Sequence, residues 1–301
     1  MFNSPPNLAE QVVLITGAST GIGAALAQIL AQQFLGIRLV LAARNAEKLE
    51  EIGTFCRKAG AEVLVVPTDL EKSEEIEKLV TNAIAHFGKV DVLVNNAGYG
   101  QMGPIELIPD QAVKRQFQIN VLAPLALIRA LVPTMRVAGG GRIINISSLG
   151  GRLAFPFGGM YSASKFALEA LSDSLRMELE PFNIQVSVIE PGPVSTEFFI
   201  AAARAVEETV VNPENTPYRA AFERLKGLEH HTKSRAWTSE RVAEVIVIAL
   251  TARRPQPRYI AATGGKFLLF MMTKVLPTKL VDLFWQRFYG INLVAQEWKN
   301  R

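Results

Sequence analysis

The sequence predicts an α/β protein with a doubly wound, mostly parallel sheet of about seven strands. Short runs of Val, Ile and Leu alternate with longer stretches of helical periodicity from residue 12 to about residue 190. These runs are nearly all Val, Ile and Leu, as expected for parallel strands that helices cover on both faces. The 301 residues show no repeat or clear linker, and 49% of them are hydrophobic, so we expect one domain with a large core.

Each expected strand corresponds to one such apolar run, and the expected helices fill the intervals between them. The strands are Val12–Ile15, Arg38–Ala42, Glu62–Val66, Val90–Val94, Arg142–Ile146, Gln185–Ile189 and Arg258–Ala262. The helices are Ile22–Gln33, Ala46–Ala59, Ser73–Phe87, Asp110–Arg136 and Ser162–Glu180. Ser73 precedes two acidic residues and is expected to cap its helix, whereas Pro181 is expected to end the last one.

Two segments depart from this alternation. Residues 197–239 are polar and helical, and Pro213 and Pro217 interrupt them, which indicates a flap beside the site. Residues 264–301 form an apolar and basic tail. We therefore expect a catalytic domain over residues 1–263, which includes the flap, followed by this tail.

Composition argues against several functions. A net charge of +4 is too small to indicate a nucleic acid partner. The single cysteine, Cys56, forms no internal disulfide, and three histidines with one cysteine argue against zinc, so no metal is expected. The sequence contains no signal-peptide core and no run of about 18 uncharged apolar residues, which favours a cytoplasmic location.

The first candidate binding motif is Thr-Gly-Ala-Ser-Thr-Gly-Ile-Gly at residues 16–23, between the first strand and the first helix. Glycines at such a position permit a tight turn and let the backbone approach a pyrophosphate at the helix N-terminus. The motif is not a P-loop, because no lysine follows it. It indicates either a dinucleotide site or an ordinary strand-to-helix turn.

The end of the second strand bears on the choice of dinucleotide. An NAD site places an acidic residue about 20 positions beyond the glycines, where it holds the ribose 2′-hydroxyl. Residues 38–45 contain no acidic side chain, and Arg44 lies just past the strand. A guanidinium group suits a 2′-phosphate, so NADP is the expected cofactor; a solvated arginine is the alternative.

The candidate catalytic groups lie later in the chain. Tyr161 and Lys165 are four residues apart, so on a helix they share one face. A cation near a phenol favours the phenolate, and we expect Lys165, helped by an oxidised nicotinamide, to lower the pKa of Tyr161. Ser147 and Ser148 follow the fifth strand, at the edge of the sheet where α/β enzymes hold their sites.

Together these motifs resemble the short-chain dehydrogenase/reductase family over roughly residues 10 to 200. Residues 16–23 match its TGxxxGIG turn, residues 95–98 its NNAG motif, and residues 191–196 its segment beside the nicotinamide. The resemblance implies a Rossmann-type fold and the catalytic residues Asn120, Ser148, Tyr161 and Lys165. The cofactor contacts that it implies are Gly17, Ser19, Thr20, Gly21, Ile22, Gly23, Arg44, Asp69, Asn96, Ala97, Gly98, Tyr161, Lys165, Pro191, Gly192, Val194 and Thr196.

The family pattern also implies a role for each catalytic group. Tyr161 is the general acid in reduction and the base in oxidation, and Ser148 hydrogen-bonds the substrate oxygen. Lys165 binds the nicotinamide ribose, Asn120 holds a water of the proton relay, and Thr196 bonds the carboxamide. Hydride passes directly between nicotinamide and carbonyl carbon, so the reaction needs no metal.

Beyond residue 240 the sequence loosely resembles hydroxysteroid- and retinol-dehydrogenase-like members, through Arg258-Tyr259, residues 264–269 and Leu276-Pro277. This implies a lipophilic substrate such as a steroid, a retinoid or an acyl chain. Five large side chains near the catalytic segments either line a pocket for it or pack in the core. They are Phe155, Phe157, Met160, Phe198 and Phe199.

The tail has a composition of its own. With nine basic and two acidic residues, Ala252–Arg301 carries +7, whereas the remainder, with 23 basic and 26 acidic residues, carries −3. A helix with a broad apolar face is expected over Thr278–Tyr289, ending at Gly290. This face packs on the domain, packs on a partner subunit, or lies on an anionic membrane as a peripheral contact.

The sequence thus indicates an NADP(H)-dependent oxidoreductase that acts on a lipophilic carbonyl or secondary alcohol and forms a homo-oligomer. The alternative is a catalytically silent, NADP-binding regulatory protein, against which the complete set of catalytic residues argues. A third hypothesis is an isomerase or epimerase that uses the same cofactor; the chain shows no second sugar-binding domain.

Overall fold

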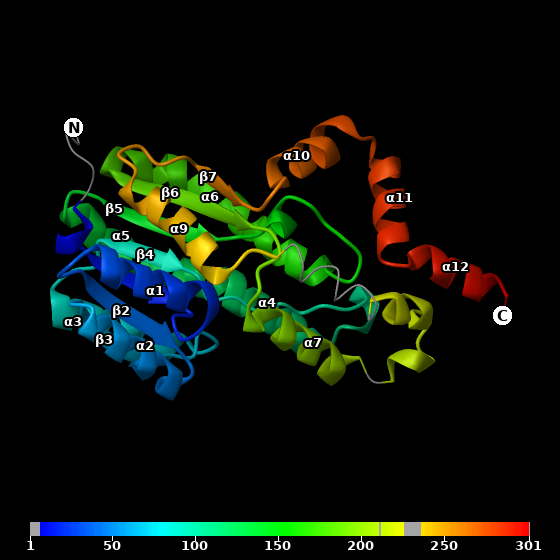
Figure 1. The fold of residues 1–301 in the computed structure, drawn as a ribbon, viewed down its shortest axis with the longest axis horizontal. Coiled ribbons are helices and arrows are strands. Elements are labelled where there is room, and N and C mark those ends of the chain that lie inside the picture. The colour runs from blue at the N-terminus through cyan, green and yellow to red at the C-terminus, as the bar shows by residue number, and fades with distance from the viewer. Residues whose placement is uncertain (1–6, 211, 226–235, 301) are drawn as a thin grey trace.

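The computed structural model describes residues 7–210, 212–225 and 236–300. Its centre is a seven-stranded sheet in the order β3-β2-β1-β4-β5-β6-β7 (Figure 1). The strands are β1 (Val12–Thr16), β2 (Arg38–Ala43), β3 (Glu62–Pro67), β4 (Val92–Asn95), β5 (Gly141–Ile146), β6 (Ile184–Pro191) and β7 (Arg258–Ala261). All neighbouring pairs are parallel, which confirms the predicted doubly wound fold.

Helices cover both faces of the sheet, because successive side chains of each strand point to opposite sides. In β1, Val13 and Ile15 pack in one core cluster, with helices α1 (Gly21–Gln33), α2 (Ala46–Lys58) and α9 (Ser239–Thr251). Val12 and Leu14 pack in the other, with α3 (Ser73–Phe87), α5 (Ala123–Val137) and α6 (Gly159–Leu179). The strand order reverses between β1 and β4, and this reversal opens a crevice at their carboxyl ends.

Two local predictions about helix ends differ from the structure. Ser73 is the first residue of α3 rather than its cap, and the capping position belongs to Lys72. Glu75 in the first turn reaches back instead, and accepts a hydrogen bond from the backbone N–H of Asp69 at 2.6 Å. α6 begins three residues earlier than expected and ends in the 3-10 turn Glu180–Phe182, which contains Pro181.

The helix predicted over Asp110–Arg136 contains an irregular turn. α4 (Asp110–Phe117) passes through a π-helical turn, Gln118–Leu122, into α5. In the described part of the chain, Asp110–Val137 is the one helical stretch long and apolar enough to cross a membrane, and half of its most apolar window is buried. Core helices meet the same criterion, and α5 belongs to the core cluster on its face of the sheet.

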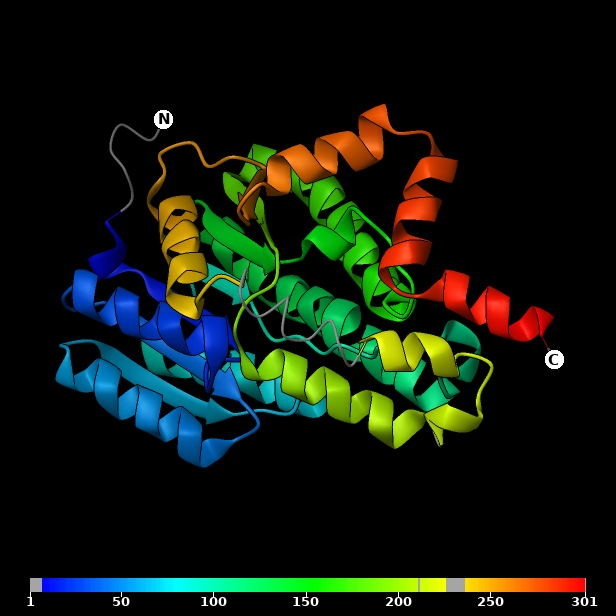
Figure 2. The ribbon, with the colours of Figure 1, turned by 45° about the vertical axis from the view of Figure 1, so that its right-hand side comes forward.

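The expected flap begins with α7 (Glu197–Thr209), which lies past the carboxyl ends of the strands (Figures 1 and 2). A 3-10 turn, Pro213–Asn215, and a helix over residues 219–225 follow it. Residues 211 and 226–235 of the predicted flap lie outside the described residues.

The tail consists of three successive helical segments that extend away from the sheet (Figure 1). They are α10 (Gly265–Phe270) with its π-helical continuation Met271–Val275, α11 (Thr278–Phe288) and α12 (Ile291–Lys299). The predicted helix over Thr278–Tyr289 is confirmed within one residue, and Gly290 follows it with φ of 76°. Only residues with low strain at positive φ, above all glycine, end a helix in this way.

Candidate active site

The glycine turn forms a cradle that admits no larger side chain. A Cβ on Gly17, whose φ is 66°, would lie 2.9 Å from the Cα of Ala97. A Cβ on Gly23, in the first turn of α1, would overlap the carbonyl oxygen of Gly17. Thr20 precedes α1 without a side-chain cap, so the first N–H groups of the helix remain available to an anion. The turn therefore fits the pyrophosphate of a dinucleotide.

Asn96 of the NNAG motif holds the glycine turn in place by hydrogen bonds. Its side-chain amide donates to the carbonyl oxygens of Thr16 at 2.8 Å and Gly17 at 3.2 Å. The hydroxyl of Thr16 in turn accepts hydrogen bonds from the backbone N–H groups of Asn96 and Ala97, at 3.1 and 3.0 Å. Hydrogen bonds between the segments that follow β1 and β4 thus fix the position of the glycine turn.

The segment after β6 forms the facing wall of the crevice. Thr196 accepts a hydrogen bond from the backbone N–H of Phe198 at 3.3 Å and thereby caps α7. Its methyl group lies 3.3 Å from the place of a Cβ on Gly21, so this wall touches the glycine turn. Backbone hydrogen bonds from Trp237 to Pro193 and from Ser195 to Trp237, both 2.9 Å, hold the segment. Pro191, Gly192 and Val194 lie on this same wall.

The four predicted catalytic residues come together beside this crevice. Ser148 follows β5, and its hydroxyl lies beside Tyr161 on α6: a Cβ on Gly150 would lie 3.4 Å from Ser148 Oγ and 3.3 Å from the ring of Tyr161. One turn further along α6, Lys165 donates from Nζ to the carbonyl oxygen of Ile146 at 2.8 Å. A Cβ on Gly98 would lie 3.8 Å from Lys165 Nζ and 3.9 Å from Asn120 Oδ1, so both groups face the same point.

Asn120 lies in the π-helical turn between α4 and α5. Its side chain is buried and pairs with the backbone of Tyr99, accepting from the N–H at 2.8 Å and donating to the carbonyl at 2.9 Å. The π-helical turn widens the helix at this position, and such turns recur at functional sites. The sequence identified the residue through the family pattern, but nothing in its local periodicity indicated the irregular turn.

Burial changes the acid–base properties of the tyrosine–lysine pair. Desolvation raises the pKa of Tyr161, and the hydrogen bond from Ser148 lowers it by less. Desolvation also lowers the pKa of Lys165 to about 8, against the opposing charge of Glu169. The lowering of the tyrosine pKa by Lys165 is expected with an oxidised nicotinamide bound and stays a prediction for that state; in the protein alone, loss of hydration sets the direction of both pKa values.

Sequence reasoning missed a buried polar network behind these residues. The hydroxyl of Ser164 accepts hydrogen bonds from the side-chain amides of Asn120 at 3.1 Å and Gln116 at 3.0 Å. Gln116 also donates to the carbonyl oxygen of Tyr99 at 2.8 Å and accepts from the N–H of Gln101 at 2.6 Å. Ser164 lies within the Tyr161–Lys165 motif, so its position could have indicated a place near the site. No sequence pattern indicated Gln116.

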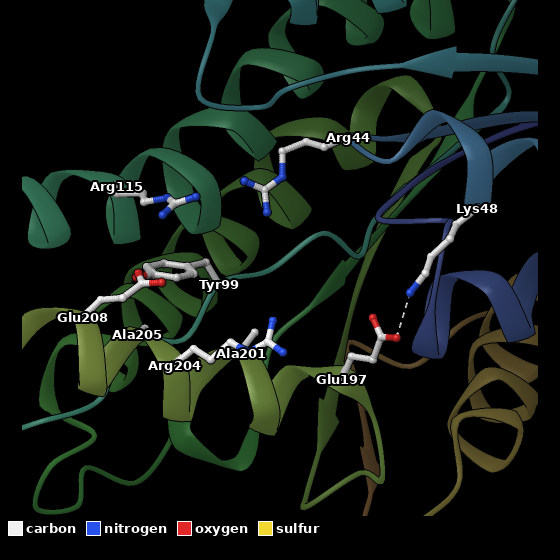
Figure 3. Close-up of a pocket in the computed structure, with 9 residues that line it drawn as sticks. All are labelled: Arg44, Lys48, Tyr99, Arg115, Glu197, Ala201, Arg204, Ala205 and Glu208. Atoms are coloured by element: carbon white, nitrogen blue, oxygen red, sulfur yellow. Dashed lines mark hydrogen bonds and ion pairs between the residues drawn. The ribbon is translucent and has the colours of Figure 1, made fainter.

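Arg44 lines a cavity of about 460 Å³ together with three further cationic side chains (Figure 3). The full lining is Arg44, Lys48, Tyr99, Arg115, Glu197, Ala201, Arg204, Ala205 and Glu208. Arg44 and Arg115 both approach Oε1 of Glu71, at 3.7 and 2.9 Å. This acidic residue stands near Asp69, whose side chain accepts from the N–H of Glu71 at 3.1 Å, and sequence reasoning missed it.

α7 closes this cavity from the side opposite α2. Lys48, in the first turn of α2, forms an ion pair of 2.9 Å with Glu197, the first residue of α7 (Figure 3). The rings of Phe198 and Tyr161 lie 5.5 Å apart, so α7 also reaches Tyr161. Only the tertiary structure brings the start of the flap and the second strand–helix unit together.

Aromatic side chains line the other side of Tyr161. Phe155 stacks on Tyr289 at 5.7 Å, and its ring and that of Tyr161 both border Gly150. Phe157 is buried against Tyr289, Tyr218 and Phe222, at ring distances of 6.3, 5.9 and 5.5 Å. Of the other expected pocket residues, Met160 is half-buried, and the side chain of Phe199 lies outside the described residues.

The fold and this site together define a Rossmann-type protein that binds a dinucleotide. The family model for short chain dehydrogenases matches residues 11–206. The chain is 33% identical to a 3-ketodihydrosphingosine reductase of Bacteroides thetaiotaomicron, over 93% of this chain and 98% of that protein. It is 34% identical to the 17-beta-hydroxysteroid dehydrogenase type 1 of Homo sapiens, over 87% and 80% of the two chains.

Two solved structures have the same fold. A short-chain dehydrogenase/reductase from Burkholderia phymatum in complex with NAD matches with a TM-score of 0.78 at 28% identity, over 89% of this chain and 94% of that one. A metagenomic short-chain oxidoreductase in complex with NADP matches with a TM-score of 0.67 at 32% identity, over 85% and 98%. The chain belongs to the short-chain dehydrogenase/reductase family, whose enzymes are NAD(P)-binding oxidoreductases.

Proposed function

We propose that this chain is an NADP(H)-dependent oxidoreductase that interconverts a carbonyl and a secondary alcohol on a lipophilic substrate. Residues 1–263 form its catalytic domain, with the flap at 197–239, and residues 264–301 form its tail. The observation that carries the proposal is that Ser148 Oγ and the ring of Tyr161 lie next to each other at Gly150, beside the glycine cradle. The buried proton donor Tyr161 next to the nucleotide site argues against a catalytically silent regulatory protein.

Each catalytic group has a task that follows from its position. A bound nicotinamide supplies or accepts the hydride. Tyr161 donates its proton to the carbonyl oxygen as that oxygen gains charge, and its raised pKa keeps the phenol protonated at neutral pH. Ser148 orients the same oxygen, Lys165 binds the nicotinamide ribose hydroxyls, and Asn120, which faces the same point as Lys165, holds the relay water.

The preference for NADP(H) rests on charge around the cavity beyond β2. Arg44, Lys48, Arg115 and Arg204 line it, and the end of β2 carries no acidic side chain. A 2′-phosphate accepts charge-assisted hydrogen bonds from arginine, and it would compete with Glu71 for two of these guanidinium groups. The remaining cofactor contacts are those of the glycine turn, Asp69, the NNAG motif and residues 191–196.

The proposal of a lipophilic substrate is based on the aromatic residues around Tyr161. Phe198 approaches it from α7, and Phe155 borders it from the loop before α6. The two named relatives are, by their names, a ketosphingoid reductase and a hydroxysteroid dehydrogenase, so we propose a steroid, retinoid or long acyl ketone.

Consumption of NADPH tests this function directly. Purified protein is given NADPH or NADH with steroid ketones, a retinoid aldehyde, long-chain ketones and a short aldehyde. We expect stoichiometric NADPH oxidation with at least one lipophilic carbonyl, and slower turnover with NADH. Tight NADPH binding without oxidation of NADPH would favour the silent regulatory protein, and conversion of a substrate without net NADPH loss would favour an isomerase or epimerase.

We further propose a cytoplasmic homo-oligomer with peripheral membrane contact through the tail. α6 exposes Phe166 and Met177, and the turn before α5 exposes Leu122, which are suitable apolar groups for contact between subunits. Light scattering at several protein concentrations measures the assembly, and a monomer throughout would contradict this part of the proposal.

A further inference from the structure

α11 has two apolar faces with different surroundings. Its inner face packs on the domain, because Trp285 and Tyr289 contact Phe155 at ring distances of 6.1 and 5.7 Å. Phe157, four residues before Tyr161, also contacts Tyr289. The tail therefore borders the aromatic residues at the catalytic tyrosine, and one of the three sequence hypotheses, packing on the domain, accounts for this inner face.

The outer face of the tail remains exposed. We define the tail face as the exposed apolar side chains of α10, its continuation and α11: Phe267, Phe270, Val275, Leu280, Leu283, Phe284 and Phe288. Phe267 is 70% exposed and Leu280 50%. Leu280, Leu283 and Phe284 follow the helical period and share one stripe. The large apolar patches that proteins expose usually mark an interaction site.

Basic side chains accompany these apolar residues. Lys266, Lys274, Lys279 and Arg287 are all exposed, and Asp282 is the single acidic residue between Gly264 and Gly290. An aromatic and aliphatic face with cations beside it is complementary to a bilayer that contains anionic lipids. Aromatic rings enter the interface, while lysine and arginine reach the headgroups.

The position of these helices agrees with such contact. α10 and α11 form an outer margin of the molecule in both views (Figures 1 and 2). A flat surface can approach this margin without meeting the sheet. The same helix, α11, carries the tail face on one side and borders the residues around Tyr161 on the other.

We infer that the tail face docks on an anionic lipid bilayer, and that the lipophilic substrate passes between the bilayer and Tyr161 along the inner side of α11. The second part rests on the proposed oxidoreductase activity; the docking, which assigns residues and a lipid class to the peripheral contact proposed above, does not. Each basic residue near an anionic surface strengthens binding about fivefold at low ionic strength, and salt screens this contribution. The contact is therefore peripheral and reversible.

Vesicle flotation of the full chain tests the docking without any turnover. Vesicles are made of phosphatidylcholine alone, or with about one third phosphatidylserine, at about 0.05 M and about 0.5 M NaCl. We expect flotation with the anionic vesicles at low salt, and at least a tenfold lower bound-to-free ratio at high salt or with neutral vesicles.

Two variants test the residues. Leu280→Ser with Phe284→Ser removes part of the apolar stripe, and Lys274→Glu with Lys279→Glu reverses two charges. Each is expected to lower the bound-to-free ratio at least tenfold. The matched controls are Val137→Ser, which is 91% exposed on α5, and Lys58→Glu with Lys114→Glu on α2 and α4; these are expected to float like the wild type. Thermal unfolding of every variant verifies the fold.

Several results would overturn the inference. One is a protein that stays unbound with anionic vesicles at low salt; another is flotation that both tail variants leave unchanged. Dimerisation that Leu280→Ser with Phe284→Ser abolishes, in the absence of flotation, would assign the tail face to a second copy of the chain. Docking that holds while every carbonyl fails as a substrate would refute the proposed function and the substrate route, and leave the docking standing.

Discussion

Replacement of Lys165 by methionine is expected to stabilise the cofactor-free protein while it abolishes activity. Lys165 is buried, and desolvation lowers its pKa from 10.5 to about 8. At ~1.4 kcal/mol per pH unit, this difference means that the charged side chain costs about 3 kcal/mol of folding free energy at neutral pH. Methionine has a similar length and carries no charge.

Part of this gain is lost again. The carbonyl oxygen of Ile146 accepts a 2.8 Å hydrogen bond from Lys165 Nζ, and its loss costs about 1 kcal/mol. Lys165→Met is therefore expected to be about 2 kcal/mol more stable than the wild type at pH 7. Its turnover is expected to fall, because the variant lacks the cation that we propose binds the nicotinamide ribose.

The pH dependence of the stability difference shows whether burial of the Lys165 charge is its cause. Because the folded-state pKa of Lys165 lies below that of the unfolded chain, the unfolded state binds more protons between about pH 8 and 10.5. Deprotonation of Lys165 therefore raises the unfolding free energy of the wild type as the pH increases through this window. The variant has no such group and lacks this increase. The advantage of Lys165→Met is expected to shrink by about 2 kcal/mol between pH 7 and about pH 9.5.

Urea unfolding of both proteins at the two pH values measures these free energies. Other titrating groups, such as Tyr161, are common to both proteins and cancel in the difference. Lys114→Met, at an exposed position on α4, is the control and is expected to show no pH-dependent difference. A variant less stable than the wild type at pH 7, or a difference that does not change with pH, would refute the reasoning.

Three further changes test the site. Tyr161→Phe is expected to lower kcat by ~10²–10⁴ with little change in the Kd of NADPH; turnover near the wild-type rate would contradict its role as proton donor. Arg44→Asp is expected to weaken NADPH binding by about tenfold to a hundredfold in titrations, and wild-type protein with equal Kd for NADPH and NADH would refute the cofactor assignment. Asn120→Ala leaves the backbone N–H of Tyr99 without its partner, whereas the carbonyl of Tyr99 keeps its bond from Gln116, so we expect about 1–3 kcal/mol lower unfolding free energy by urea titration; unchanged stability would contradict the bracing contacts.

Several features of the fold could be predicted because neighbouring residues encode them. The first four residues of β1, Val12–Ile15, are all apolar, since helices cover both faces of the strand. Gly17 and Gly23 stand where backbone approaches backbone, and no other residue fits there. Tyr161 and Lys165 needed only the helical repeat to share a face.

Other features depend on segments that are distant in the sequence. Gln116 and Ser164 lie 48 positions apart and meet behind Asn120. Lys48 and Glu197 lie 149 positions apart, and their ion pair sets the start of α7 against α2. No periodicity within either segment indicates such a contact, because it depends on how the helices cross the sheet.

The sequence by itself determined the doubly wound class, the glycine cradle and the spacing of the catalytic groups, since local backbone geometry and hydrophobic period carry that information. Only the tertiary structure decided the electrostatics of the tyrosine–lysine pair. Burial raises the pKa of Tyr161 and lowers that of Lys165, and the spacing of the two residues in the sequence indicates neither effect. Hydration depends on everything that packs around a side chain, and that packing exists only once the distant segments have met.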